Sequence, residues 1–142
     1  MITPPFMIID GDDFICFDDL QDMTMFMEPW QFEEEADRFI YVDANQQILK
    51  FAVEALNKRP LWQGRVVYVG IDEEKKIEDV EDLRHRLAEY VSARTKDISF
   101  LDVSWERLVQ VVEEKLLVKY QNGVSLGQIL RNYLSGVFRR KT

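Results

Sequence analysis

Residues 38–56 decide the fold class of this chain, and they read RFIYVDANQQILKFAVEAL. After the arginine, the first part consists of β-branched and aromatic residues, which favour a strand. From residue 49 onward, the apolar side chains at 49, 51, 53 and 55 alternate with other residues, a period of two that predicts a strand with one buried face. The polar residues 43–47 between these runs form turns readily. The stretch therefore predicts a central hairpin in an antiparallel sheet.

The residues before this stretch predict a second hairpin and a short helix. Apolar runs at 6–9 and 14–17 flank Asp10-Gly11-Asp12-Asp13, a strong turn sequence. Asp18 or Asp19 can cap a short helix that follows, and Pro29 limits its length.

The residues after the central stretch predict one further strand and three helices. Residues 65–71 are mostly apolar without alternation, which is typical of a strand that lies centrally or is covered on both faces. Apolar spacing of three and four residues then predicts helices over about 77–94, after Ser104, and over 125–140. We therefore expect the α+β class: an antiparallel sheet of about five strands packed by three C-terminal helices. No repeat or internal linker interrupts residues 1–142, so we expect one domain.

Length and composition limit the classes of protein that fit. A chain of 142 residues can bury a sizeable core without a disulfide or metal. The single cysteine, Cys16, lies in an apolar run and is expected to be a buried hydrophobic residue. No apolar run approaches the ~20 residues of a membrane span, and the N-terminus lacks the basic region of a signal peptide. We expect a cytoplasmic protein, either a monomer or a homodimer.

The acidic charge is concentrated in the N-terminal third. Residues 1–50 contain 12 acidic residues and two basic ones, whereas residues 51–142 contain 14 acidic and 16 basic residues. Such a field repels nucleic acid and membrane phosphates and attracts basic partners or cations. A solvated, solubilising surface is the alternative explanation.

An enzymatic alternative comes from the sequence Met7-Ile8-Ile9-Asp10-Gly11-Asp12. A hydrophobic strand followed by D-x-D resembles the first motif of haloacid-dehalogenase-type phosphotransferases. This resemblance implies a magnesium-dependent phosphotransferase or phosphatase in which Asp10 is the nucleophile and Asp12 the acid/base. That fold requires parallel βαβ units, whereas Phe14–Phe17 is expected to return directly as an antiparallel strand.

Other patterns that indicate catalysis or cofactor binding are missing from the sequence. Asp10, Asp12 and Asp13 have the oxygen ligands that calcium prefers, but the glycine and glutamate positions of an EF-hand loop are absent. The chain also has no P-loop, G-x-G-x-x-G, G-x-S-x-G or Cys/His cluster. We therefore expect no catalytic residue, no cofactor and no metal.

A binding surface for a basic protein is the preferred hypothesis. Acidic residues steer the encounter with such a partner, and aromatic residues beside them slow its dissociation. The predicted contact residues combine the two kinds: Asp12, Asp13, Asp19, Asp22, Trp30, Glu33 and Glu34.

A resemblance makes this hypothesis more concrete. The order of strand, D-G-D-D turn, strand, Asp18-Asp19-Leu20, Glu28-Pro29-Trp30 and residues 38–50 resembles the small acidic immunity proteins of bacterial polymorphic toxin systems, over about the first 55 residues. The resemblance implies a non-enzymatic protein that occludes the basic active site of a toxin, for example a nuclease. A third alternative is a structural or adaptor subunit that docks through its last helix, Ser125–Arg140.

Overall fold

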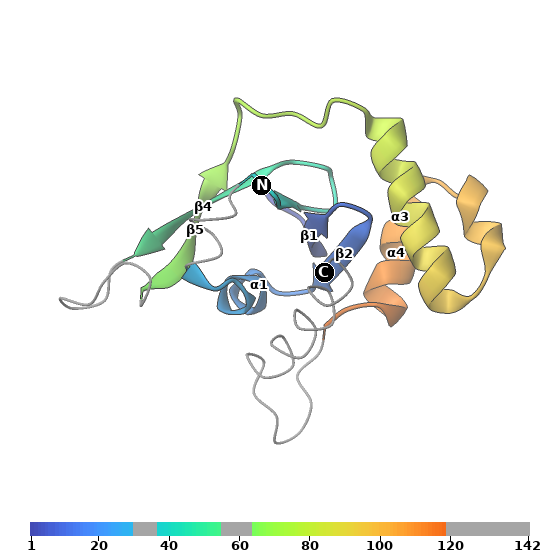
Figure 1. The fold of residues 1–142 in the computed structure, drawn as a ribbon, viewed down its shortest axis with the longest axis horizontal. Coiled ribbons are helices and arrows are strands. Elements are labelled where there is room, and N and C mark those ends of the chain that lie inside the picture. Colours follow the sequence, from blue (N-terminus) through green and yellow to red (C-terminus); the bar gives the residue numbers. More distant parts are fainter. Residues whose placement is uncertain (30–36, 55–63, 119–142) are drawn as a thin grey trace, which may run out of the picture.

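The computed structural model describes residues 1–29, 37–54 and 64–118 (Figure 1). Its strands are β1 (Phe6–Asp10), β2 (Asp13–Phe17), β3 (Ile40–Val42), β4 (Leu49–Glu54) and β5 (Arg65–Ile71). Its helices are α1 (Leu20–Phe26), α3 (Val80–Thr95), α4 (Trp105–Lys115) and the short 3-10 helix η2 (Ile98–Asp102). The expected α+β class with antiparallel pairing is confirmed. The helix predicted at 125–140 lies outside the described residues.

The described strands form two sheets, so the prediction of one sheet of about five strands is wrong. One sheet has the order β2-β1-β3, and the other consists of β4 and β5. Every pair of neighbouring strands is antiparallel. The predicted N-terminal hairpin is confirmed as β1 and β2, in which Asp10 pairs with Asp13.

The predicted central hairpin is correct in its turn and wrong in its strand pairing. Val42 and Ile48 form an isolated antiparallel bridge on either side of the turn. Beyond this bridge the two strands diverge, because β3 pairs with β1 and β4 pairs with β5. The ring of Phe51 packs against the ring of Tyr41 at 5.2 Å between centroids, edge to face. The buried face of β4 therefore packs against the first sheet and does not extend it.

Strand β1 is buried on both faces and organises the core. Phe6 and Ile8 belong to one hydrophobic cluster, together with α1, β4 and β5. Met7 and Ile9 point to the opposite face and belong to a second cluster, together with α3 and α4. This alternation follows from the period of two along a strand. The three-stranded sheet is therefore the middle layer of the described structure.

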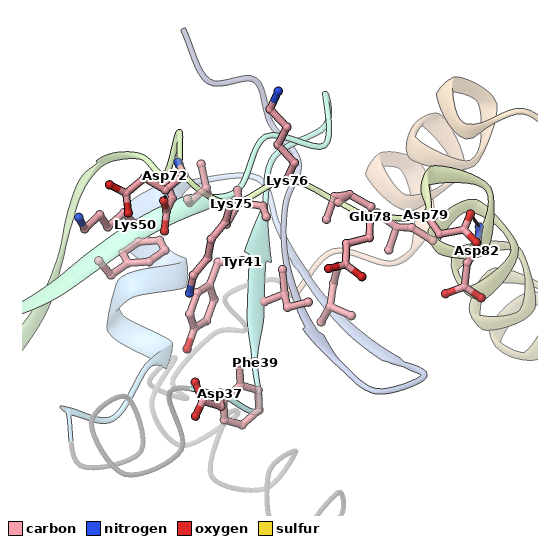
Figure 2. A pocket seen from close by; sticks show the side chains of 18 of the residues that line it. Asp37, Phe39, Tyr41, Lys50, Asp72, Lys75, Lys76, Glu78, Asp79 and Asp82 are labelled. Atoms are coloured by element: carbon pink, nitrogen blue, oxygen red, sulfur yellow. Dashed lines mark hydrogen bonds between the residues drawn. The ribbon is translucent and has the colours of Figure 1, made fainter.

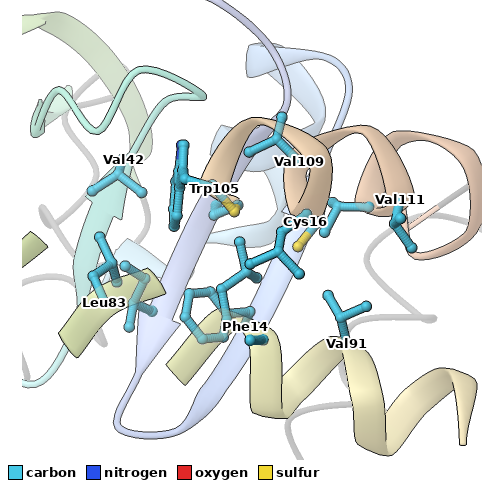
Figure 3. Close-up of a cluster of buried hydrophobic side chains, with 14 residues drawn as sticks. Phe14, Cys16, Val42, Leu83, Val91, Trp105, Val109 and Val111 are labelled. Atoms are coloured by element: carbon cyan, nitrogen blue, oxygen red, sulfur yellow. The ribbon is translucent and has the colours of Figure 1, made fainter. Parts of the chain in front are cut away.

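The second cluster joins the two long helices to the sheet. Figure 3 shows Leu83 and Val91 of α3 and Trp105 of α4 around Phe14 and Cys16 of β2. Side chains of the size of leucine each contribute about 1.5–3 kcal/mol when they are fully buried. The helices begin at their caps: Asp79 accepts a hydrogen bond from the Asp82 N–H, and the Ser104 hydroxyl accepts one from the Arg107 N–H.

The expectation that residues 65–71 lie centrally or are covered on both faces is wrong. Strand β5 is at an edge of the two-stranded sheet, and Val69 is 54% exposed. A continuous apolar run without alternation cannot distinguish an exposed edge from a covered centre. Among the described strands, β1 and β2 are covered on both faces, because each contributes side chains to both hydrophobic clusters.

Candidate interaction surfaces

The turn between β1 and β2 presents an acidic tip. Gly11 has a φ of 59°, a left-handed conformation that glycine adopts without strain, and this allows the two-residue turn. The side chain of Asp12 at the tip is 91% exposed. Asp13 is partly buried at the start of β2. Both predicted contact residues of this turn therefore lie at the end of the hairpin.

Asp10, in contrast, is buried and paired. Both of its carboxylate oxygens accept hydrogen bonds from Arg38, from Nε and from Nη2, each at 3.1 Å. The strand that follows its turn runs antiparallel to β1. A parallel βαβ unit, which the phosphotransferase alternative implies, does not occur among the described strands. Asp10 thus joins the hairpin to the beginning of β3.

Arg86 of α3 connects the hairpin turn to the helix. Its Nη2 donates a hydrogen bond to the carbonyl oxygen of Gly11. Its Nε lies 3.8 Å from Oδ1 of Asp12, and its Nη1 lies 3.9 Å from Oδ2 of Asp82. The guanidinium therefore holds two carboxylates from distant parts of the sequence close together.

An open groove of about 770 Å³ lies where β3 and β4 diverge (Figure 2). Phe39, Ile40 and Tyr41 line one side, and residues 48–51 line the other. Asp72, residues 74–79 and the start of α3 complete the lining. The divergence that separates the predicted hairpin is thus also the origin of this groove.

The two ends of the groove differ in charge. Figure 2 shows Glu78, Asp79 and Asp82 together at the α3 end, whereas Lys50 and Lys75 lie beside Asp72 at the β4 end. Asp37 and Arg86 also line the groove, and Arg86 contacts Asp12. The α3 end therefore has acidic side chains from the hairpin turn and from the start of α3, whereas Asp37, from the residues before β3, lines the groove beside Phe39 (Figure 2). We call these residues the acidic rim: Asp12, Asp37, Glu78, Asp79 and Asp82.

The loop between β3 and β4 is fixed by a buried carboxylate. Oδ1 of Asp43 accepts hydrogen bonds from the backbone N–H groups of Asn45 and Gln47, at 3.0 and 2.9 Å. Oδ2 accepts from the backbone N–H of Thr3 and from Nε2 of Gln47, at 3.0 and 2.9 Å. The indole Nε1 of Trp105 donates to the carbonyl oxygen of Ala44 at 2.7 Å. These contacts tie the closed end of the groove to the N-terminus and to α4.

A second acidic cluster surrounds the N-terminus of α1. Asp19 is the N-cap, and its carboxylate accepts a hydrogen bond from the Gln21 N–H at 2.6 Å. The pKa of Asp22 is raised by partial burial and, to a lesser extent, by the neighbouring charges of Asp19 and Asp18. Strand β2, about 13 Å long at 3.3 Å per residue, separates this cluster from the hairpin turn.

The predicted contact residues therefore do not form one patch. Asp12 and Asp13 lie together at the hairpin turn, and Asp19 and Asp22 lie together at the other end of β2. The other three predicted residues, Trp30, Glu33 and Glu34, lie outside the described residues.

Sequence reasoning missed most of the acidic rim. Of its residues, only Asp12 is among the predicted contact residues; Asp37, Glu78, Asp79 and Asp82 are not. The sequence around Asp37 and the sequence at the start of α3 carry no signal that these side chains lie near the groove. The signal that was available is Arg38, one of two basic residues in the first 50, which an acidic neighbourhood would require as a partner.

Two searches of the described residues gave negative results. No group of three His, Cys, Asp or Glu side chains in ranges 1–29, 37–54 and 64–118 is arranged to hold a metal ion. Among the helices described there, none has both the length and the apolar character needed to cross a bilayer.

Comparison with known proteins gave no match: no family model, no curated protein and no solved structure is significantly similar to this chain.

Proposed function

We propose that this chain is a non-enzymatic protein-binding module that recognises a basic segment of a partner protein through the acidic end of its groove. The observation that carries the proposal is the acidic rim: Asp37, Glu78, Asp79 and Asp82 line one open cavity, and Arg86 of the same lining contacts Asp12. Because these carboxylates outnumber Arg86, the rim favours encounter with a basic partner.

The lining supplies the second requirement of a binding site, which is apolar area. Phe39, Ile40 and Ile77 line the groove beside the rim, and Ile40 remains exposed. A partner side chain with an aliphatic stem and a cationic head, such as lysine or arginine, fits this combination because the stem packs on apolar surface and the head meets a carboxylate.

The most concrete form of the proposal is an immunity protein that neutralises a toxin. An enzyme that grips phosphates presents lysines and arginines around its active site, and an acidic groove complements such a surface. In this role the chain acts in the cytoplasm by covering the active site, and its own residues perform no chemistry. The chemical class of the partner is therefore a basic protein, with a nuclease as the leading example.

The test uses a variant of the rim and a charge-matched control. The rim variant carries Asp37→Asn, Glu78→Gln and Asp82→Asn. The control carries Glu73→Gln, Glu113→Gln and Glu114→Gln, which removes the same charge from exposed positions that do not line the groove. Each protein is immobilised, challenged with lysate of the source organism at low salt, and the retained proteins are identified by mass spectrometry.

We expect the wild type and the control to retain the same basic protein and the rim variant to lose it. The retained protein should inhibit growth when it is expressed alone, and co-expression of the wild-type chain should restore growth. Equal retention by the rim variant would show that the groove is not the recognition site. A retained protein without toxicity would refute the immunity role but not the binding role.

A further inference from the structure

The last described residues lead the chain to the second acidic cluster. Leu117 forms a parallel bridge with Cys16, and the Val118 N–H donates to the carbonyl oxygen of Cys16 at 2.8 Å. Because the two segments run in the same direction, the described chain ends near Phe17, immediately before Asp18. Residues 119–142 therefore leave the described structure beside the N-terminus of α1.

The sequence of these 24 residues is basic and amphipathic. It contains five basic residues and no acidic residue. The basic residues are Lys119, Arg131, Arg139, Arg140 and Lys141. Apolar residues recur at intervals of three and four from 126 to 138. This composition is opposite in sign to residues 1–29, which contain seven acidic residues and no lysine or arginine.

The surface beside this exit is an apolar groove between α1 and β5. It has a volume of about 320 Å³, and its lining includes Leu20, Met25, Val67 and Tyr68. Arg65 also lines it, and this guanidinium is paired with Glu54 at 3.2 Å. Met25 is 54% exposed. The groove is therefore apolar surface on α1 that no described element covers.

Acidic side chains surround the N-terminus of α1, next in sequence to Leu20 and Gln21 of the groove lining. Asp18, Asp19 and Asp22 lie there, and none of the basic side chains in the described ranges comes within ion-pair distance of them. Partial burial and, to a lesser extent, the charges of Asp19 and Asp18 raise the pKa of Asp22. A basic amphipathic segment complements this surface in charge and in polarity.

We propose that residues 119–142 dock on the groove between α1 and β5, with their apolar side chains over Leu20 and Met25 and their basic side chains against Asp18, Asp19 and Asp22. Reach is not limiting, because α1 has seven residues and is about 10 Å long, whereas 24 residues span about 36 Å even as a helix. This docking is independent of the acidic rim, which lies at the other end of β2.

Paramagnetic relaxation in the full chain tests this inference. Thr142→Cys provides a site for a nitroxide label, and the native Cys16 is 1% exposed and stays unlabelled. We expect selective broadening of the backbone amide signals of residues 18–25 and 66–68. Uniform broadening, no broadening, or selective broadening at the acidic rim would overturn the proposal.

Three further samples complete the test. In a mixture of isotope-labelled chain without nitroxide and nitroxide-labelled chain without isotope, broadening would reveal docking on a second copy and would overturn the intramolecular proposal. In the labelled chain, Arg139→Gln with Arg140→Gln should reduce the broadening several-fold, whereas the control pair Arg107→Gln and Lys115→Gln on α4 should leave it unchanged. Equal effects of the two pairs would contradict charge-directed docking.

Discussion

Replacement of Asp43 by alanine should destabilise the fold more than any other single change in the β3–β4 loop. The carboxylate is fully buried and accepts hydrogen bonds from three backbone N–H groups and one side-chain amide. The amide of Gln47 can turn to solvent, but the backbone donors of Thr3, Asn45 and Gln47 lose their acceptor. At about 1 kcal/mol for each orphaned donor, the expected loss is about 3 kcal/mol of unfolding free energy.

Asparagine at this position should give an intermediate result. Its carbonyl oxygen can still accept from the N–H groups of Asn45 and Gln47, but its amide nitrogen faces the Thr3 N–H, which is also a donor. We expect Asp43→Asn to cost about 1–2 kcal/mol. The predicted order of stability is therefore wild type, then asparagine, then alanine.

Urea denaturation followed by circular dichroism measures this order. With a slope of about 2 kcal/mol/M, a loss of about 3 kcal/mol lowers the midpoint by about 1.5 M. Asp72→Ala is the control, because Asp72 also accepts a backbone N–H, from Glu74 at 3.2 Å, but in an exposed turn. It should cost less than about 0.5 kcal/mol. If Asp43→Ala lost no more stability than Asp72→Ala, the loop would not be held by this carboxylate.

Three further predictions follow from buried or crowded groups. Trp105→Phe removes the hydrogen bond to the Ala44 carbonyl and should lower the unfolding free energy by about 1–2 kcal/mol, as measured by urea denaturation. An unchanged unfolding free energy would mean that the indole contributes by packing alone. Because the pKa of Asp22 is raised in the folded state, its contribution to stability falls as pH rises from the unfolded value through the folded one. Asp22→Asn should therefore gain a few tenths of a kcal/mol relative to the wild type between pH 3 and pH 6, and a pH-independent difference would contradict this. Burial raises the pKa of the Cys16 thiol to about 12. At pH 8 a thiol reagent should therefore modify Cys16 at least about 100-fold more slowly in the folded chain than in urea. Equal modification rates would show that the β2 face opens readily.

The local elements could be predicted from the sequence because their signals are local. The turn at Gly11, the cap of α1 at Asp19 and the cap of α4 at Ser104 each depend on residues a few positions apart. Helix α3 follows its apolar spacing but begins at Val80, after the Asp79 cap. The 3-10 helix η2 carried no periodic signal in its five residues and was not predicted.

Strand pairing could not be predicted because the hydrophobic pattern identifies a buried face and not a neighbour. The alternation of Leu49 and Phe51 correctly indicates a half-buried strand. Whether that face extends the sheet beside Tyr41 or packs against it depends on non-local contacts, which here favour the edge-to-face packing of Tyr41 and Phe51. The sequence therefore predicted the turn of the central hairpin and missed the groove that opens beyond it.

The sequence predicted the acidic character of the candidate site but only some of the residues that form it. The acidic character of the surface follows from composition, and Asp12 belongs to the rim. Glu78 and Asp82 are 66 and 70 residues away from Asp12 in the sequence, and the contacts of Arg86 that join Asp82 to the turn are visible only in the fold. Asp19 and Asp22 were assigned to the same patch but lie at the other end of β2.

The most direct test of the acidic rim is the association rate of the purified partner as a function of salt. At low ionic strength we expect the rim variant to bind at least about 10-fold more slowly than the charge-matched control, and the difference should shrink toward unity near 1 M salt, where the screening length is about 3 Å. Association rates that are equal for the rim variant and the control at low salt would contradict recognition through the groove.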